Sequence, residues 1–139
     1  MKIKPLIIKA RYYETDKMGI IHHSNYIRWF EEARVDVLEQ LGLGYDKLEA
    51  MGIISPVLTM NCKYIHPVLF NEEVEITANL VSFTGVRLEV YYEIKKTATG
   101  QICTTGSSTH GFIDNNGKPI RMKKQFPDIY EIIINSIKD

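Results

Sequence analysis

The chain has 139 residues, a length typical of one ordinary domain, and we expect a single domain over residues 1–139. Hydrophobic residues make up 45% of it, enough for a core that needs neither disulfides nor a structural metal to fold. Lys plus Arg number 17 and Asp plus Glu number 17, and this zero net charge argues against a nucleic-acid-binding protein, because such proteins carry an excess of positive charge.

Two features of the sequence bear on the compartment. Cys62 and Cys103 form no CxxC pair, which favours free structural thiols in a reducing compartment. The apolar run near the N-terminus is interrupted by Pro5 and Lys9 and is too short for a signal peptide. No stretch approaches the ~20 apolar residues of a membrane span. We therefore expect a cytoplasmic protein without stable membrane insertion.

The first half of the chain predicts a strand, a loop and a long helix. Residues 6–13 are rich in β-branched and aromatic side chains, as strands are, and residues 14–23 have no clear period. Ser24 or Asn25 is expected to cap the helix that follows. Apolar side chains then recur every three or four positions and share one helix face. They are Tyr26, Phe30, Ala33, Val37 and Leu41.

The long helix is expected to end at Gly42, and residues 45–51 predict a short second helix. From Val57 onward the period of the apolar residues changes to two, which predicts about four strands. Turn sequences such as Thr99-Gly100 separate these strands closely, so the sheet is expected to be antiparallel. One strand is predicted over residues 101–113, and residues 129–137 predict a terminal helix. The order of elements indicates an α+β fold with a sheet wrapped on a helix.

The stretch RYYETDKMGIIHHSNYIRWFEEAR, residues 11–34, carries the side chains best suited to chemistry. It places Tyr12, Asp16 and His23 between a strand end and a helix start, where catalytic groups commonly lie. The helix start adds unpaired backbone N–H groups with a partial positive charge. Such donors can stabilise an oxyanion that forms from a carbonyl group. The carboxylate of Asp16 can act on that carbonyl as a general base for water or as a nucleophile.

These residues also carry a resemblance to a known family. The pattern Tyr12-x-x-Thr15-Asp16-x-x-Gly19-x-x-x-His23-x-x-Tyr26, followed by Phe30-Glu31-x-Ala33-Arg34, resembles the signature of thioesterases of the 4-hydroxybenzoyl-CoA type. Within them it is most similar to the Tol–Pal-associated acyl-CoA thioesterase branch. Tyr64-x-x-Pro67 and Asp114-x-x-Gly117-Lys118-Pro119-x-Arg121 fit as well, so the resemblance extends over nearly the whole chain.

The resemblance implies a hot-dog fold, in which an antiparallel sheet of five or six strands wraps around one long central helix. It implies an acyl-CoA substrate, hydrolysed to free acid and coenzyme A, with no cofactor. It also implies homodimers joined edge to edge through their sheets, or homotetramers that are dimers of dimers, with active sites at the subunit interface.

The resemblance also assigns roles to single residues. Asp16 takes the position of the essential carboxylate, and Tyr12 and His23 match its supporting Tyr and His. Gly19, Ser55 and Thr59 are expected to bind substrate, with residues 55–59 approaching the neighbouring subunit's site. His22 departs from the pattern, because many relatives have an aromatic or apolar residue there.

Several other side chains have simpler interpretations. Glu14 is expected to be a solvated carboxylate, and Glu31 with Arg34 has the spacing of a structural helical ion pair. The four histidines show no HxxxH or HExxH spacing, so no metal site is expected. No GxSxG nucleophile elbow and no phosphate-binding glycine loop occur either.

Three alternative functions stay open at this level. The acyl group could be carried by acyl carrier protein instead of coenzyme A. A hot-dog module could bind acyl-CoA without cleaving it, although Asp16 and the lack of an attached DNA-binding segment disfavour this. A hot-dog hydratase or dehydratase is the weakest alternative, because its usual pairing of His with an acidic residue is not visible.

Overall fold

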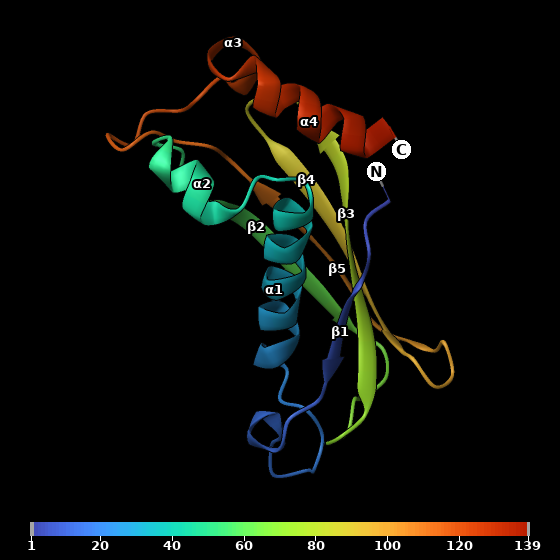
Figure 1. Cartoon of the computed structure of the whole chain (residues 1–139). Helices are drawn as coiled ribbons and strands as arrows, with labels where there is room; N and C mark the ends of the chain where they lie inside the picture. Colours follow the sequence, from blue (N-terminus) through green and yellow to red (C-terminus); the bar gives the residue numbers. More distant parts are fainter. Residues whose placement is uncertain (1, 139) are drawn as a thin grey trace.

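A five-stranded antiparallel sheet curves around one long helix in the computed structural model, which describes residues 2–138 (Figure 1). The strand order is β1-β3-β4-β5-β2, so β1 and β2 form the two edges of the sheet. The strands are β1 (Leu6–Lys9), β2 (Val57–Tyr64), β3 (Glu73–Phe83), β4 (Leu88–Lys96) and β5 (Ile102–His110). The predicted hot-dog architecture and the lower of the two expected strand numbers are confirmed.

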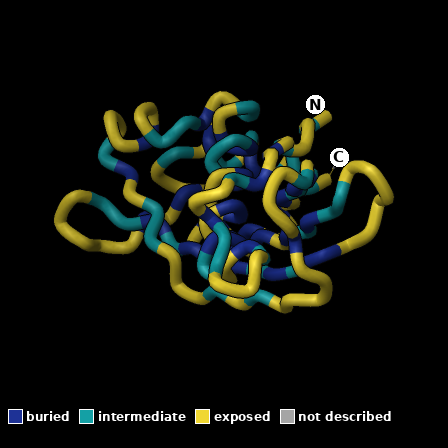
Figure 2. Tube along the Cα trace, turned by 90° about the horizontal axis from the view of Figure 1, so that it is seen from below, coloured by how far each residue is buried: buried dark blue, intermediate teal, exposed yellow. Residues whose placement is uncertain are grey.

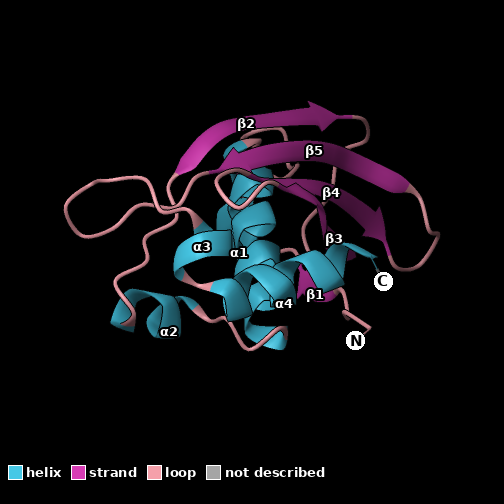
Figure 3. Ribbon diagram, turned by 90° about the horizontal axis from the view of Figure 1, so that it is seen from above, coloured by secondary structure: helices cyan, strands magenta, loops and turns pink. Residues whose placement is uncertain are grey.

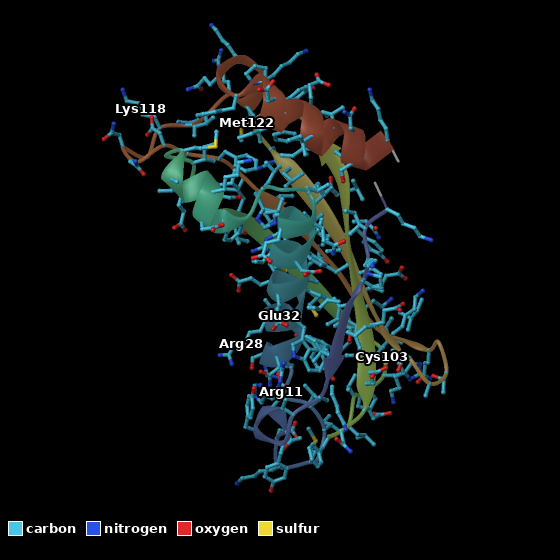
Figure 4. All side chains as sticks on the ribbon, in the orientation of Figure 1. Arg11, Arg28, Glu32, Cys103, Lys118 and Met122 are labelled. Atoms are coloured by element: carbon cyan, nitrogen blue, oxygen red, sulfur yellow. The ribbon has the colours of Figure 1, made fainter. Side chains whose placement is uncertain are left out.

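The long helix α1 (Ser24–Gln40) lies on the concave face of the sheet (Figure 3). Its predicted apolar face is confirmed, since four of the five expected residues are buried and Leu41, just past the helix, is half-buried. Arg28 and Glu32 point away from the sheet (Figure 4). Gly42 has a φ of 80°, a left-handed conformation that glycine adopts without strain, and it ends the helix as expected.

The helix reaches the sheet most closely at Phe30. Its ring stacks on Tyr92 of β4, with centroids 4.5 Å apart. Tyr92 lies opposite Gly106 of β5 in the strand register. A Cβ atom on Gly106 would lie 2.6 Å from Phe30 Cε2, so a glycine is needed for this approach. The inner face of the sheet and α1 together form the buried core, visible as the dark interior of Figure 2.

The remaining helices lie around the end of the sheet opposite the start of α1 (Figure 1). They are α2 (Tyr45–Ala50), α3 (Met122–Gln125) and α4 (Pro127–Lys138), and α4 packs against β3. The terminal helix therefore begins two residues before the predicted range. No helix within residues 2–138 is long and apolar enough to cross a membrane.

Two predicted strands are shorter than expected. β1 stops at Lys9, and the chain then turns through the 3-10 helix η1 (Tyr12–Glu14) instead of continuing to residue 13. The Glu14 carboxylate accepts a hydrogen bond from the Arg11 backbone N–H at 2.8 Å, which closes this turn. β5 stops at His110, after which Ile113 makes only isolated bridges.

Candidate functional site

Glu14 anchors the loop that carries Asp16. Glu14 is 5% exposed, so the expectation of a solvated carboxylate is wrong. Its Oε2 accepts a hydrogen bond from the indole Nε1 of Trp29 at 2.9 Å, and its backbone oxygen accepts one from Asn25 Nδ2 at the same distance. These bonds connect the loop to the first turns of α1 and hold Asp16 near the helix start.

Asp16 is half-buried and has one oxygen engaged. Its Oδ1 accepts a hydrogen bond from the Met18 backbone N–H at 2.7 Å, and its backbone pairs with Ile20. This is an Asx turn, the structural role that aspartate often has in loops. Among residues 2–138, no group donates to Oδ2, so one carboxylate oxygen is available to a ligand. Asp16 can therefore hold the turn through Oδ1 and still bind a ligand through Oδ2.

The start of α1 differs from the prediction. Neither Ser24 nor Asn25 caps the helix through its side chain, since Ser24 is its first residue and Asn25 donates to Glu14. The ring of His22 takes that place, because its Nδ1 accepts a hydrogen bond from the Ser24 backbone N–H at 3.2 Å. The ring of His22 also stacks on that of His23, with centroids 4.2 Å apart.

His23 lies directly before the helix and is held from the opposite side by β2. The hydroxyl of Tyr64 donates a hydrogen bond to the His23 backbone oxygen at 3.1 Å. The two rings meet edge to face at 6.2 Å. Within the described part of the chain, the His23 backbone N–H donates to no acceptor, which leaves one helix-start donor free.

Asp16 and His23 line the same cleft, which has a volume of about 310 Å³. The cleft lies between the Asp16 loop, the start of α1 and the segment that follows β2. Its walls are mainly apolar and aromatic, with a few polar groups, as small-molecule sites usually are. The lining residues are Asp16, Met18, Ile20, Ile21, His23, Tyr26, Tyr64, Ile65, His66 and Pro67.

Tyr26 and Tyr64 belong to this site, although neither was among the site residues predicted from the sequence. Tyr26 was expected as a core residue of the helix and as a position of the family signature, but not as a site residue, and its ring meets Tyr64 edge to face at 5.3 Å. Tyr64 and Pro67 were recognised as part of the Tyr64-x-x-Pro67 motif, but not as neighbours of Asp16. That motif was the one signal in the sequence that pointed to this wall of the cleft.

The other predicted site residues lie elsewhere in a single chain. Tyr12 is 75% exposed and contacts Phe70 edge to face at 5.5 Å, outside the cleft. Gly19 lies in the Asp16 loop with a φ of 80°, which explains a glycine there. Ser55 lies beside α2 in a separate cavity of about 100 Å³, and Thr59 pairs with Thr109 across β2 and β5. One chain therefore unites Asp16 with His23 but not with Tyr12, Ser55 or Thr59.

A second, basic cleft lies at the opposite end of the molecule. It has a volume of about 300 Å³ and is lined by the turn between β3 and β4 and by the residues around α3. Three of its six lining residues carry positive charge, namely Arg121, Lys123 and Lys124. The nearby Lys118 projects from the same end, far from Arg11 at the η1 end (Figure 4). Within residues 2–138, no group of three or more potential metal ligands occurs.

Comparisons with known proteins agree with this fold. The model of a thioesterase-like superfamily matches residues 10–131. A relative from Bacillus subtilis named putative acyl-CoA thioesterase YneP is 33% identical over 129 residues, which cover 92% of this chain and 93% of the relative.

Solved structures give the same picture. The DHNA-CoA thioesterase from Staphylococcus aureus matches with a TM-score of 0.89 and 39% identity, covering 95% of this chain and 89% of the other. A 1,4-dihydroxy-2-naphthoyl-CoA thioesterase from Synechocystis matches with a TM-score of 0.85, covering 98% of each chain. At 14% identity, this second likeness is one of fold alone.

Proposed function

Because the chain belongs to the thioesterase-like superfamily, we propose that it is an acyl-CoA thioesterase that hydrolyses its substrate at Asp16. The observation that carries this proposal is the free Oδ2 of a positioned Asp16 in a largely apolar cleft, beside a helix start with an unused N–H group. A water-activating or attacking carboxylate and an oxyanion donor are the two groups that thioester hydrolysis needs most.

In the proposed reaction, the thioester carbonyl accepts a hydrogen bond from the His23 backbone N–H. Asp16 either removes a proton from the attacking water or attacks the carbonyl carbon itself to form an anhydride, which water then hydrolyses to the free acid. The carbon–sulfur bond breaks, and coenzyme A leaves as a thiolate, which needs less acid assistance than an alkoxide. The position of His23 is supported by Tyr64, because this tyrosine binds the carbonyl of the residue that carries the donor.

Two copies of the chain would complete the site. β2 is an edge strand with largely exposed side chains, so its outer edge can pair with another strand. Antiparallel pairing with a second β2 would bring the Val57 end of one copy towards the Tyr64 end of the other. Ser55 and Thr59 of one copy would then approach Asp16 of its neighbour, and we propose a homodimer or a dimer of dimers on this basis.

The same pairing would also bring the basic cleft towards the neighbour's Asp16. Coenzyme A carries phosphate groups, and Arg121, Lys123 and Lys124 offer them positive charge. The cluster also suits an acidic carrier protein, so acyl carrier protein remains the alternative carrier. Parallel kinetics on both carriers distinguish these two.

An aromatic acyl group fits this chain best. Tyr26 and Tyr64 line the cleft with their rings edge to face, and the Staphylococcus aureus neighbour at 39% identity is named for an aromatic acyl-CoA. We propose a hydroxylated aromatic acyl-CoA as substrate, with 4-hydroxybenzoyl-CoA and 1,4-dihydroxy-2-naphthoyl-CoA as the candidates to compare. We also propose that the chain belongs to the Tol–Pal-associated branch of these thioesterases.

The test is thiol release from short aliphatic, long aliphatic and aromatic acyl-CoAs, measured on the wild type and Asp16→Asn side by side. We expect the wild type to hydrolyse at least the aromatic substrates. Asp16→Asn should lose on the order of a hundredfold or more in kcat, as removal of a general base commonly does. Near-wild-type turnover by Asp16→Asn would contradict the proposed mechanism. Binding without turnover by the folded wild type would favour an acyl-CoA-binding module.

A further inference from the structure

Tyr26 lines the cleft, and the mechanism above leaves its hydroxyl unused. Tyr26 is 4% exposed, yet it lines the cleft together with Asp16. Its oxygen accepts a hydrogen bond from the Val68 backbone N–H at 3.1 Å. Its ring is held edge to face between Trp29 and Tyr64, with centroids 5.4 and 5.3 Å away. The position of this hydroxyl is therefore well determined.

The hydroxyl proton, in contrast, has no acceptor within residues 2–138. Burial raises the pKa of Tyr26, and the charge of Asp16 adds a smaller contribution in the same direction. The phenol therefore keeps its proton at neutral pH and can donate it in a hydrogen bond. Asp16 and Tyr26 line the same cleft, but the two side chains make no direct hydrogen bond.

The unused hydrogen-bonding groups of Tyr26 and Asp16 are complementary. Tyr26 has one unused donor, and Asp16 Oδ2 is one unused acceptor. A water molecule both accepts and donates hydrogen bonds, so it can bridge them and still have a lone pair to attack with. A thioester carbonyl accepts only, and it satisfies Tyr26 while leaving Asp16 without a partner.

We propose that Tyr26 is a further catalytic residue, whose hydroxyl holds the hydrolytic water against Asp16. This inference rests on the proposed thioesterase function and selects general-base catalysis over a covalent acyl–Asp16 intermediate. Asp16 takes one proton from the water while the water oxygen bonds to the acyl carbon. The carbon–sulfur bond breaks, coenzyme A leaves as the thiolate, and Tyr26 keeps its own proton throughout.

The test is a double-mutant cycle with Tyr26→Phe and Asp16→Asn, measured on an aromatic acyl-CoA at enzyme concentrations high enough to follow slow variants. Tyr26→Phe should lower kcat about tenfold to a hundredfold and change KM by less than about threefold. The double variant should be no slower than Asp16→Asn alone, because both side chains act on the same water.

The matched control is Tyr92→Phe, which removes another buried hydroxyl that does not line the cleft. The Tyr92 hydroxyl accepts a hydrogen bond from Arg34 Nη1 at 3.2 Å and shares one with Ser108 Oγ at 2.6 Å. This control should lose thermal stability but keep the wild-type kcat. Tyr26→Phe should lose stability as well, because it removes the acceptor of the Val68 backbone N–H.

The outcomes separate this inference from the proposed function. If Asp16→Asn is inactive while Tyr26→Phe keeps kcat within about twofold, the inference is wrong and the thioesterase proposal stands. Independent, multiplicative losses in the double variant would equally overturn it, because they indicate a structural effect. A wild type without any hydrolysis, or an active Asp16→Asn, removes the proposed mechanism and the inference with it.

Discussion

Glu14 shows how a single buried carboxylate organises the candidate site. It lies two residues before Asp16 and binds the indole of Trp29, one turn past the helix start. A buried carboxylate that is replaced by a neutral group accepts weaker hydrogen bonds from its donors, which costs roughly 1–3 kcal/mol. The position of Asp16 therefore depends on a residue that touches no substrate in the proposed mechanism.

We predict that Glu14→Gln lowers the free energy of unfolding by about 2 kcal/mol, because the amide retains the size but not the charge of the acceptor. Chemical denaturation followed by Trp29 fluorescence measures this directly. Glu32→Gln is the control, since Glu32 is exposed on α1 and its replacement should stay within about 0.5 kcal/mol. Equal stabilities of the two variants would contradict the assigned role of Glu14.

His110 predicts a dependence of stability on pH. Its side chain is completely buried and shares a hydrogen bond with Ser108 Oγ at 2.7 Å. Burial, and secondarily the charge of Arg34, lowers the pKa of His110 to about 4 from its ordinary 6.5. Below pH 6.5 the unfolded chain takes up a proton that the folded chain does not, so stability is full above this pH and falls towards pH 4.

This shift corresponds to a loss of about 3 kcal/mol over that range. We predict that His110→Gln is less stable than the wild type at pH 7 but loses about 2 kcal/mol less on acidification to pH 4.5. Urea denaturation at both pH values measures the difference. His22→Gln, which removes an exposed histidine, should keep the wild-type dependence, and identical pH slopes for all three proteins would refute the assignment.

At the scale of elements, the contact between α1 and the sheet depends on Gly106. The ring of Phe30 occupies the space that a side chain at Gly106 would need, and a Cβ there would also lie 2.5 Å from the Asn61 backbone oxygen. The Asn61 oxygen belongs to β2, which is paired with β5 along its length, so neither this atom nor the ring of Phe30 can move aside cheaply. Overpacking of this kind typically costs 1–3 kcal/mol, sometimes more.

We predict that Gly106→Ala lowers the unfolding free energy by about 3 kcal/mol. Gly111→Ala is the matched control, because its Cβ would meet only Leu58, at an ordinary contact distance of 3.6 Å. Thermal unfolding of both variants gives the comparison. A Gly106→Ala protein as stable as Gly111→Ala would mean that Phe30 has room to move.

At the scale of the whole molecule, the edge strand β2 connects assembly with activity. Val57 and Leu58 are 48% and 49% exposed at its start, close to Ser55. In the proposed dimer, this end approaches the neighbour's Asp16 cleft. Charges on an edge strand oppose pairing between sheets, as natural proteins use them to prevent aggregation.

We predict that the double variant Val57→Lys, Leu58→Lys is monomeric and loses at least about tenfold in kcat/KM, although Asp16 is unchanged. Light scattering after size-exclusion chromatography reports the mass, and thiol release reports the activity. Ile7→Lys is the control, because Ile7 is 49% exposed on the opposite edge strand. A monomeric variant with full activity would show that one chain suffices.

The sequence by itself determined the elements and the residue types of the site. Periods of two and of three to four residues report which side chains face the core, so the strands, α1 and the buried face were predictable. The Tyr12 to Tyr26 pattern identified the Asp16 loop for the same reason: its residues are neighbours along the chain. Predictions of this kind need only local information.

Only the tertiary structure decided which of these residues meet. Tyr64 is 41 residues from His23, and no local pattern indicates that its hydroxyl binds the His23 carbonyl. Glu14 has the polarity of a surface residue, and its burial follows from the partner that Trp29 supplies. Tyr12 lies outside the cleft because the chain turns after β1. Such contacts arise from the closing of the sheet around the helix, which satisfies polar groups from distant segments together.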